Sequence, residues 1–169
     1  WNTGNVKDMA LMFHSASAFN GNISRWNTAN VEDMQNMFYR TSVFNSDISR
    51  WNTANVNDMF GMFDEASVFN SDISLWNTEN VKHMSNMFAK ASVFNGDISG
   101  WNTTNVEYMI GMFSNAHSFN QNVSKWDVTN VGPNGNFNFC NQWGAGDGFT
   151  SNQPKWRSGL INCTQYKDN

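Results

Sequence analysis

The chain repeats one 25-residue unit five times without a gap. Each copy closely follows the pattern Trp-Asn-Thr-x-Asn-Val-x-x-Met-x-x-Met-Phe-x-x-Ala-x-x-Phe-Asn-x-Asp-Ile-Ser-x. The copies begin at Trp1, Trp26, Trp51, Trp76 and Trp101, and a sixth copy starts at Trp126 and stops after Val131. A fixed period of this length is typical of a solenoid, because one unit cannot bury its apolar face alone and must stack on its neighbours. We therefore predict a repeat domain over residues 1–131 and a separate C-terminal segment over residues 132–169.

Composition narrows the class of protein. Charged residues make up only 14% of the 169 residues, the formal net charge is −4, and Lys and Arg are scattered. Without a basic stripe to neutralise phosphates, nucleic-acid binding is not expected. No apolar run approaches the roughly 18 residues that a membrane-spanning helix needs, and no signal peptide is present. Because the first residue is Trp1, we expect the chain to be part of a longer protein.

Apolar spacing within the repeat indicates a helix followed by a strand. In the second copy, Val31, Met34, Met37, Phe38 and Thr41 fall on one stripe of a helix. Thr28 or Asn30 is placed to cap this helix, with Asp33 in the role that Glu has in a capping box. After Phe44, we predict a short strand around residues 47–50 and a turn through Trp51. Stacked coils would then align these strands in a parallel sheet, with about 4.8 Å between neighbours.

Identical residues recur at the same place on every coil, which predicts interior columns. One column consists of phenylalanines: Phe19, Phe44, Phe69, Phe94 and Phe119. The Trp, the Val and the two Met of each repeat form further columns, and the two Met columns contain all ten methionines. A methionine column suits either a soft metal or a deformable core. Because no Cys or His column accompanies it, we assign it to the core.

Two polar columns allow a functional and a structural interpretation. Asp47, Asp72 and Asp97 would stand about 5 Å apart, where unpaired carboxylates repel. Hydrogen bonds to Asn, Ser or the next coil's backbone would hold them, and Ca²⁺ bridging the coils is the alternative, since hard oxygen ligands suit it. The threonine column invites an ice-binding interpretation, but capping or turn bonding explains it better: Thr3, Thr28, Thr53, Thr78 and Thr103.

The sequence gives no sign of a catalytic centre. His14, His83 and His117 occupy different positions in their repeats, so they form no column, and we assign them to the surface. No Cys/His cluster has the spacing of a zinc site, and no glycine-rich phosphate loop precedes a helix. We expect no enzymatic activity and no cofactor.

The segment from Gly132 to Asn169 has no period and contains both cysteines, Cys140 and Cys163. We predict that they form a disulfide that staples a cap over the last coil, which implies an oxidising compartment; two free thiols are the alternative. The aromatic residues that would cover the last coil are Phe137, Phe139, Trp143, Phe149 and Trp156. A separate binding module is the alternative to a cap.

Four Asn-x-Ser/Thr sequons are candidate glycosylation sites: Asn22, Asn102, Asn122 and Asn162. Their number is close to that expected by chance in a chain so rich in Asn, Ser and Thr. They are therefore weak support for secretion.

The repeat closely resembles the BspA-like, DUF285-type repeats of surface proteins. The consensus of that family is similar to Trp-Asp-Val-Ser-Asn-Val-Thr-x-Met-x-x-Met-Phe, and residues 126–131 read Trp-Asp-Val-Thr-Asn-Val. The resemblance covers residues 1–131. It implies an α/β repeat solenoid, a leucine-rich-repeat-like right-handed coil with one short strand and one short helix per repeat. It also implies an extracellular or cell-surface location and a role in adhesion, and it transfers no site residue.

Two functions remain open. The first is a non-enzymatic extracellular or cell-surface protein that mediates adhesion by binding protein or glycan through one face of the solenoid. The second is a structural building block of a surface filament, wall or appendage, whose partner is a copy of itself. A binder should carry its variable residues on one face, whereas a building block should carry surfaces that dock onto another copy.

Overall fold

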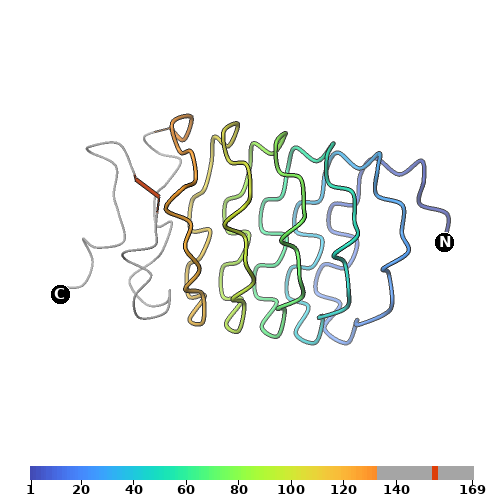
Figure 1. Ribbon diagram of the computed structural model, residues 1–169. Coiled ribbons are helices and arrows are strands. Elements are labelled where there is room, and N and C mark those ends of the chain that lie inside the picture. Colours follow the sequence, from blue (N-terminus) through green and yellow to red (C-terminus); the bar gives the residue numbers. More distant parts are fainter. Residues whose placement is uncertain (133–153, 156–169) are drawn as a thin grey trace.

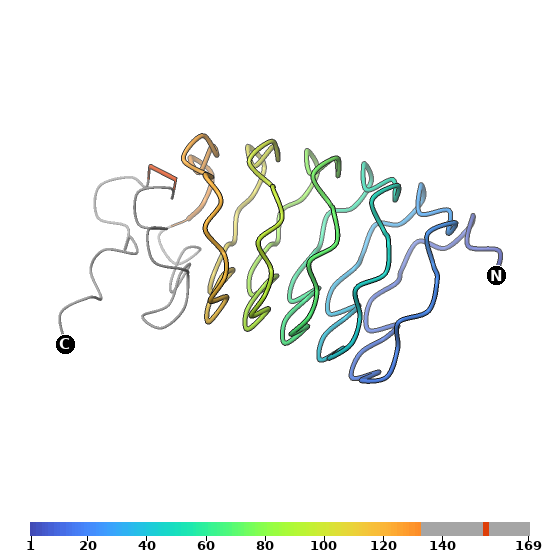
Figure 2. The same ribbon diagram turned by 60° about the horizontal axis from the view of Figure 1, so that its bottom comes forward.

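The repeats stack as successive coils in the computed structural model, which describes residues 1–132 and 154–155. Both views show the coils side by side in chain order along one axis (Figure 1, Figure 2). Each coil is one 25-residue repeat, so residues 25 apart in the sequence lie next to each other in space. A residue type at a given place in the repeat therefore forms a column along the stack.

The coils contain neither the helix nor the strand that we predicted for each repeat. Over residues 1–132 and 154–155 the chain forms turns and irregular segments, without a helix or an extended strand. Strand-like pairing is limited to isolated parallel bridges at the eighth position of successive repeats: Asp8 with Asp33, Asp33 with Asp58, Asp58 with His83, and His83 with Tyr108. The strand predicted at residues 47–50 is an irregular segment that ends in a turn at residues 49 and 50. The prediction of an α/β coil, with its helix cap and its continuous sheet, is therefore wrong.

Alternating hydrogen bonds explain why the apolar stripe is not a helix. In the second repeat, alternate N–H groups donate to the next coil at 2.7 to 3.0 Å: Met34 to Asp58, Asn36 to Phe60, Phe38 to Met62 and Arg40 to Asp64. Three other N–H groups donate to the carbonyl three residues back: Met37 to Met34, Tyr39 to Asn36, and Thr41 to Phe38. The N–H of Gln35 donates to the Asp33 side chain. An α-helix would need every N–H to bond the carbonyl four residues back. Half of the donors in this segment instead join the coils.

Left-handed residues set this alternation. Asn36 and Arg40 have φ angles of 52° and 59°, and each is the third residue of a turn, where a type II turn requires a positive φ. The same two places in the other repeats also have positive φ: Leu11 and Ser15, Gly61 and Glu65, Asn86 and Lys90, Gly111 and Asn115. A right-handed helix cannot pass through two such residues four apart. The chain therefore forms consecutive turns over the segment where we predicted a helix.

The predicted interior columns are confirmed. The residues that we placed on one helical stripe, Val31, Met34, Met37, Phe38 and Thr41, are all completely buried, although they lie on turns. Nine of the ten methionines are buried in the core, and only Met12 of the first coil is exposed. Both Met columns are therefore part of the core.

Aromatic rings stack along the whole core. Adjacent rings of the Phe19-to-Phe119 column lie 5.8 to 6.0 Å apart, and a second column from Phe13 to Phe113 has spacings of 5.5 to 5.7 Å. Within one coil the two columns touch, as Phe38 and Phe44 do at 3.9 Å. The tryptophans form a third column, with centroids 5.8 to 6.4 Å apart. From the rings of Phe13, Phe19 and Trp26 onward, these three columns form one continuous aromatic core. Trp1 at the open end of the stack is 93% exposed and lies outside it.

Polar side chains bond the coils together around this core. The Thr28 hydroxyl donates to the carbonyl of Asn52, and Thr53 donates in the same way to Asn77, each at 3.0 Å. The indole Nε1 of Trp51 donates to the carbonyl of Ile23 at 3.2 Å. The threonine column is buried, so it does not present the exposed ladder that ice binding requires. Its role is to satisfy backbone carbonyls between coils.

Candidate functional site

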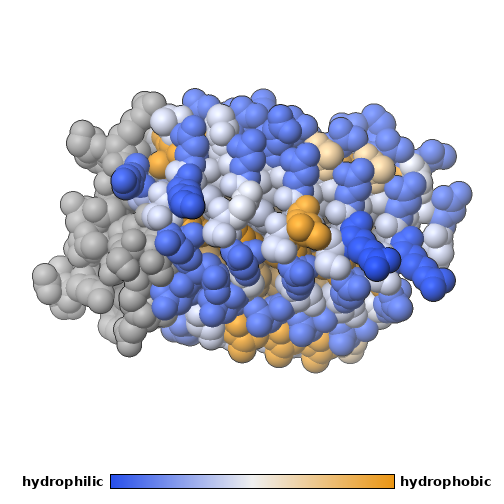
Figure 3. Space-filling view, in the orientation of Figure 1, coloured by the Kyte–Doolittle hydropathy of each residue, from blue (hydrophilic) through white to orange (hydrophobic). Residues whose placement is uncertain are grey.

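The residues that differ between repeats lie on the outside of the stack, where they are the candidates for function. The seventh position of the repeat is occupied by Lys7, Glu32, Asn57, Lys82 and Glu107, and all five side chains are exposed. Rows of hydrophilic side chains also run along the stack on the face shown in Figure 3. In contrast, the Val, Met and Phe columns of the repeat lie inside. The framework and the variable surface are therefore separate parts of each coil.

Two shallow hollows follow each other along one side of the stack, and we call them together the edge groove. The first has a volume of about 460 Å³ and is lined by Lys7, Asn30, Glu32, Asn55, Asn57, Asn80 and Lys82. The second has a volume of about 500 Å³ and is lined by Lys82, Asn105, Glu107, Tyr108, Asn130 and Gly132. Lys82 belongs to both hollows. The edge groove thus extends from the first coil to the start of the sixth.

A column of asparagines forms one border of the edge groove. Each Asn Nδ2 donates to a backbone carbonyl of the preceding coil at 2.6 to 2.8 Å: Asn30 to Gly4, Asn55 to Ala29, Asn80 to Ala54, Asn105 to Glu79, and Asn130 to Thr104. All five side chains are exposed. The hydrogen bonds fix the orientation of each carboxamide, so the groove presents a row of ordered polar groups.

Opposite charges alternate along the other border. Lys7 Nζ and Glu32 Oε1 are 2.8 Å apart, and Lys82 Nζ and Glu107 Oε1 are 4.0 Å apart. The hydrogen bond from Lys7 to Glu32 raises the pKa of the lysine. Because the chain between these pairs carries the neutral Asn57, the charges of this column cancel. Exposed pairs of this kind contribute little to stability. Their main effect is to set the charge of the surface along this border.

The residue at the eighth position changes along the stack from aspartate to an aromatic residue. Asp8, Asp33 and Asp58 each accept a hydrogen bond from the N–H two residues further on, at 2.8 Å. Burial raises the pKa of Asp33, and the neighbouring carboxylates of Asp58 and Asp8 raise it further. In the last two coils the aspartates give way to His83 and Tyr108, whose rings stack at 4.6 Å. The first half of this column is therefore acidic, and the second half is aromatic.

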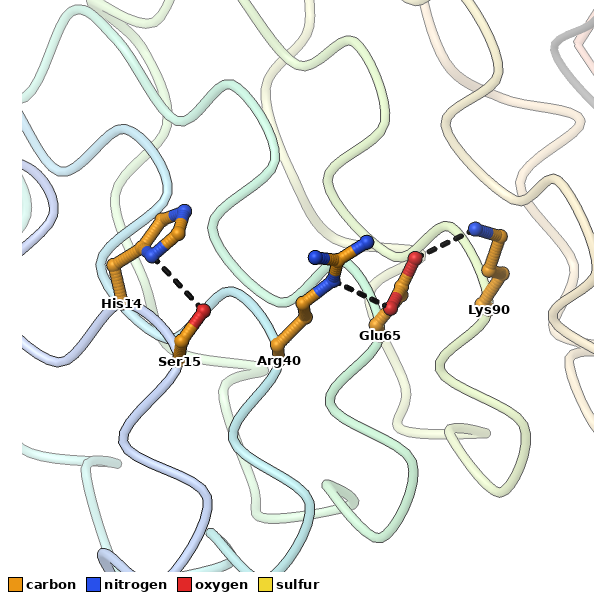
Figure 4. A network of polar contacts seen from close by, with 5 residues as sticks. All are labelled: His14, Ser15, Arg40, Glu65 and Lys90. Atoms are coloured by element: carbon orange, nitrogen blue, oxygen red, sulfur yellow. Dashed lines mark hydrogen bonds and ion pairs between the residues drawn. The ribbon is translucent and has the colours of Figure 1, made fainter.

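A second charged cluster crosses three coils elsewhere on the stack (Figure 4). Glu65 accepts a hydrogen bond from Arg40 Nε at 2.8 Å and from Lys90 Nζ at 2.6 Å. These two bonds, with Lys90 contributing most, lower the pKa of Glu65. In the first coil, His14 Nδ1 and Ser15 Oγ lie 3.0 Å apart, and the His14 ring packs on Tyr39 at 4.7 Å. Since Arg40, Glu65 and Lys90 all have positive φ, the cluster ties together the left-handed residues of three coils.

Asp64 lies beside this cluster and is half-buried. Its Oδ1 atom is shielded from solvent and has no hydrogen-bond partner. Burial raises the pKa of Asp64 to about 6, although the positive charges of Lys90 and Arg40 oppose the rise. Because the folded state holds its proton more tightly than the unfolded chain does, the contribution of Asp64 to stability is greatest at low pH. It is lost as pH rises from about 4 through 6.

We expect the Asp64→Asn substitution to stabilise the protein above pH 6. Asparagine carries no charge that has to be desolvated, so the gain should be about 1 kcal/mol, less than the full pKa displacement implies because water screens the exposed part of the side chain. Urea unfolding of both proteins at several pH values measures the difference, which should shrink towards pH 4. A difference that is the same at pH 4 and pH 8 would contradict the assignment.

The predicted calcium candidates lie on the surface. Asp47, Asp72 and Asp97 are exposed, and each Oδ1 accepts a hydrogen bond from the N–H of the serine two residues further on, at 2.9 to 3.0 Å. The hydrogen bonds to serine lower the pKa of all three carboxyl groups. The serine belongs to the same coil, so these bonds close local turns. In the part of the chain that the structure describes, no three His, Cys, Asp or Glu side chains come together in a way that could hold a metal ion.

The remaining sequence-predicted positions are divided between the surface and the undescribed tail. Among the sequons, Asn22, Asn102 and Asn122 are exposed, and each Oδ1 accepts the N–H of the Ser or Thr two residues on at 3.0 to 3.1 Å. His14 and His117 are exposed and His83 is half-buried, as expected of surface histidines. Asn162, the cysteines Cys140 and Cys163 and the five tail aromatics all lie outside the described residues.

The edge groove was not predicted from the sequence. Its borders come from the fifth and seventh positions of the repeat, and the sequence predicts a helix cap for the fifth. One signal was present, because the fifth position is Asn in all six copies while the seventh changes its charge from copy to copy. An invariant polar column beside a variable charged one indicates a framework position next to a position that is free to vary.

A comparison with protein-family models matches two overlapping segments of the chain, residues 1–91 and 48–144, to the Mycoplasma protein of unknown function, DUF285. The chain belongs to the DUF285 family. The resemblance seen in the repeat is thereby confirmed for most of the chain. Searches of curated proteins and of solved structures find no match. Among the residues that the structure describes, there is no helix long and apolar enough to cross a membrane.

Proposed function

We propose that this DUF285 chain is a non-enzymatic binding module of an extracellular or cell-surface protein, which mediates adhesion by contacting a partner with its variable outer columns. The observation that carries the proposal is the separation of the repeat into an invariant interior and a variable exterior. The seventh column changes charge from coil to coil, while the Val, Met and Phe columns of the core keep their residue type in every repeat. Exposed substitutions cost little stability, so the outer columns are free to vary to fit a partner while the interior keeps the fold.

The framework suits such a role. Interior stacking and ladders between coils hold the outer side chains at fixed intervals, and a rigid surface loses little entropy on binding. Solenoids commonly use extended faces of this kind for recognition. The edge groove offers amides, carboxylates and ammonium groups within one surface. These groups could bind a protein or a glycan without catalysing a reaction.

We expect the full chain to bind at least one extracellular protein or oligosaccharide saturably while it remains a monomer. Biolayer interferometry against a panel of purified extracellular-matrix proteins and oligosaccharides measures binding, and light scattering after gel filtration measures mass. Heat-denatured chain is the control for adsorption to the sensor. The absence of saturable binding to the whole panel would contradict the proposal.

The alternative, a structural building block, is favoured by one observation. Val43, Val68 and Val93 occupy the same place in three adjacent coils, and all three are exposed. Such a row could pack laterally against another copy, since burying apolar surface favours association. A polymer or a stable dimer in the mass measurement, combined with no binding to the panel, would support this function in place of adhesion.

A further inference from the structure

The second hollow of the edge groove combines groups that recognise sugars. We propose that this hollow, lined by Lys82, Asn105, Glu107, Tyr108 and Asn130, binds an uncharged linear oligosaccharide that lies along the stack. The inference rests on the proposed binding function and names its ligand class. Four properties of the hollow support it: fixed amides, an exposed aromatic platform, a cancelled charge and a regular spacing.

The carboxamides of Asn105 and Asn130 are already oriented by hydrogen bonds. Asn105 Nδ2 donates to the carbonyl of Glu79 at 2.8 Å, and Asn130 Nδ2 donates to that of Thr104 at 2.6 Å. Both residues are exposed, and a carboxamide oxygen has two lone pairs that can accept hydrogen bonds. Sugar hydroxyls donate to such oxygens and also accept from Lys82 or donate to Glu107. Because these side chains are already oriented, a ligand does not have to order them.

Tyr108 provides an apolar surface next to these polar groups. Its side chain is 40% exposed, and its ring packs on His83 at 4.6 Å with an angle of 25° between the planes. This stacking holds the Tyr108 ring on the face that packs against His83. A tyrosine offers a rigid apolar face with a polar tip, which complements a pyranose ring with C–H groups on its face and hydroxyls around its rim.

Charge separates this hollow from the rest of the edge groove. Lys82 and Glu107 are 4.0 Å apart, and the other lining residues are neutral, so the hollow has no net charge. A polyanion would need an excess of Lys and Arg to replace its counterions, which the lining lacks. The first hollow is lined by two lysines, Lys7 and Lys82, and one carboxylate, Glu32, so it carries a net positive charge, and its lining includes no aromatic residue. A neutral sugar therefore fits the second hollow best.

Regular spacing favours a linear ligand over a single sugar. Asn105 and Asn130 are one coil apart, as are Lys82 and Glu107. Adjacent coils joined by backbone hydrogen bonds are separated by about 5 Å. One hexopyranose in an extended β-linked chain advances by about the same step. Successive sugar units can therefore meet equivalent groups on successive coils.

Binding of the full chain to an array of neutral and anionic oligosaccharides tests the inference, followed by calorimetric titration of the best neutral ligand. We expect the wild-type chain to bind neutral oligosaccharides. Tyr108→Ala should weaken this binding at least tenfold (about 1.4 kcal/mol), whereas Tyr108→Phe, which keeps the ring, should stay within about threefold. Thermal melting of each variant shows whether it remains folded.

Tyr39→Ala is the matched control. Tyr39 also packs on a histidine of the neighbouring coil, at 4.7 Å from His14, but it does not line the edge groove. We expect binding of this variant to stay within twofold of wild type. An equal loss in both alanine variants, or binding to anionic oligosaccharides alone, would overturn the inference. If the wild-type chain binds proteins and no neutral sugar, the inference fails and the proposed binding function stands; if it binds nothing, both fail.

Discussion

Phe63→Ala should destabilise the protein by about 3 to 5 kcal/mol, a cost typical of replacing a buried phenylalanine with alanine. Phe63 is completely buried at the centre of the aromatic core. Its ring stacks between Phe38 at 5.6 Å and Phe88 at 5.7 Å, and it touches Phe69 at 3.8 Å. Alanine would remove all these contacts and leave a cavity that the coils on either side cannot fill, because hydrogen bonds fix their separation. Urea unfolding followed by circular dichroism measures the loss.

Phe63→Ala should also make unfolding less cooperative. In a stack where each coil contacts only its neighbours, stability is a sum of coil and interface contributions. A weak interface in the middle should let the two ends unfold separately, so the transition of Phe63→Ala should broaden. Val68→Ala is the control, because Val68 lies on the next turn of the same coil and is exposed; it should stay within about 0.5 kcal/mol of wild type. A loss below about 1 kcal/mol for Phe63→Ala would contradict the role assigned to the column.

The sequence was sufficient to predict the columns, because the 25-residue period alone determines which residues become neighbours. The burial of Met37, Phe38 and Phe44 follows from their apolar character and their recurrence, whatever the local backbone. The local backbone was predicted incorrectly because the spacing of Val31, Met34, Met37 and Phe38 suits one face of a helix and also suits consecutive turns that bury the same positions. Apolar spacing by itself does not separate these two structures.

A signal for the turns was present at one of the two left-handed positions. The eleventh position of the repeat is Asn36, Gly61, Asn86 and Gly111 in four of the copies, and Asn and Gly are the residues that tolerate a positive φ best. A helix interior with Asn or Gly at the same place in four copies is unusual. The fifteenth position carries Arg40, Glu65 and Lys90, which give no such signal. Their conformation follows from the turns and the ladders between coils.

The edge groove could not be predicted from one repeat. Its borders become neighbours only when several coils stack, and Tyr108 gives it aromatic character where tyrosine replaces the aspartate of the earlier coils. The location of a site on a repeat protein thus depends on departures from the repeat. The consensus describes the framework, and the exceptions mark where a ligand could bind.

Gly61→Val should destabilise the protein by about 2 to 3 kcal/mol, because it acts on the feature that distinguishes the turns from a helix. Gly61 has a φ of 57°, where a β-branched residue is strained by about 1 to 2 kcal/mol. A Cβ atom at this place would also collide with the Oδ1 of Asn36 in the preceding coil. Because this atom is the end of a side chain that can turn aside, the overpacking adds about 1 kcal/mol. Urea unfolding at neutral pH measures the sum of the two costs.

Two further variants separate the strain from the collision. Gly61→Asn meets the same Asn36 side chain, but Asn already adopts a positive φ at the equivalent positions 36 and 86, so this variant should lose less stability than Gly61→Val. Gly100→Val is the matched control, since a Cβ atom on Gly100 has no neighbour within 4 Å and its φ is not positive; it should stay within about 0.5 kcal/mol of wild type. Equal losses for Gly61→Asn and Gly61→Val would mean that the collision alone sets the cost. Left-handed geometry would then not be what selects Asn and Gly at this position, and the ladders between coils would have to hold the turns without help from local sequence.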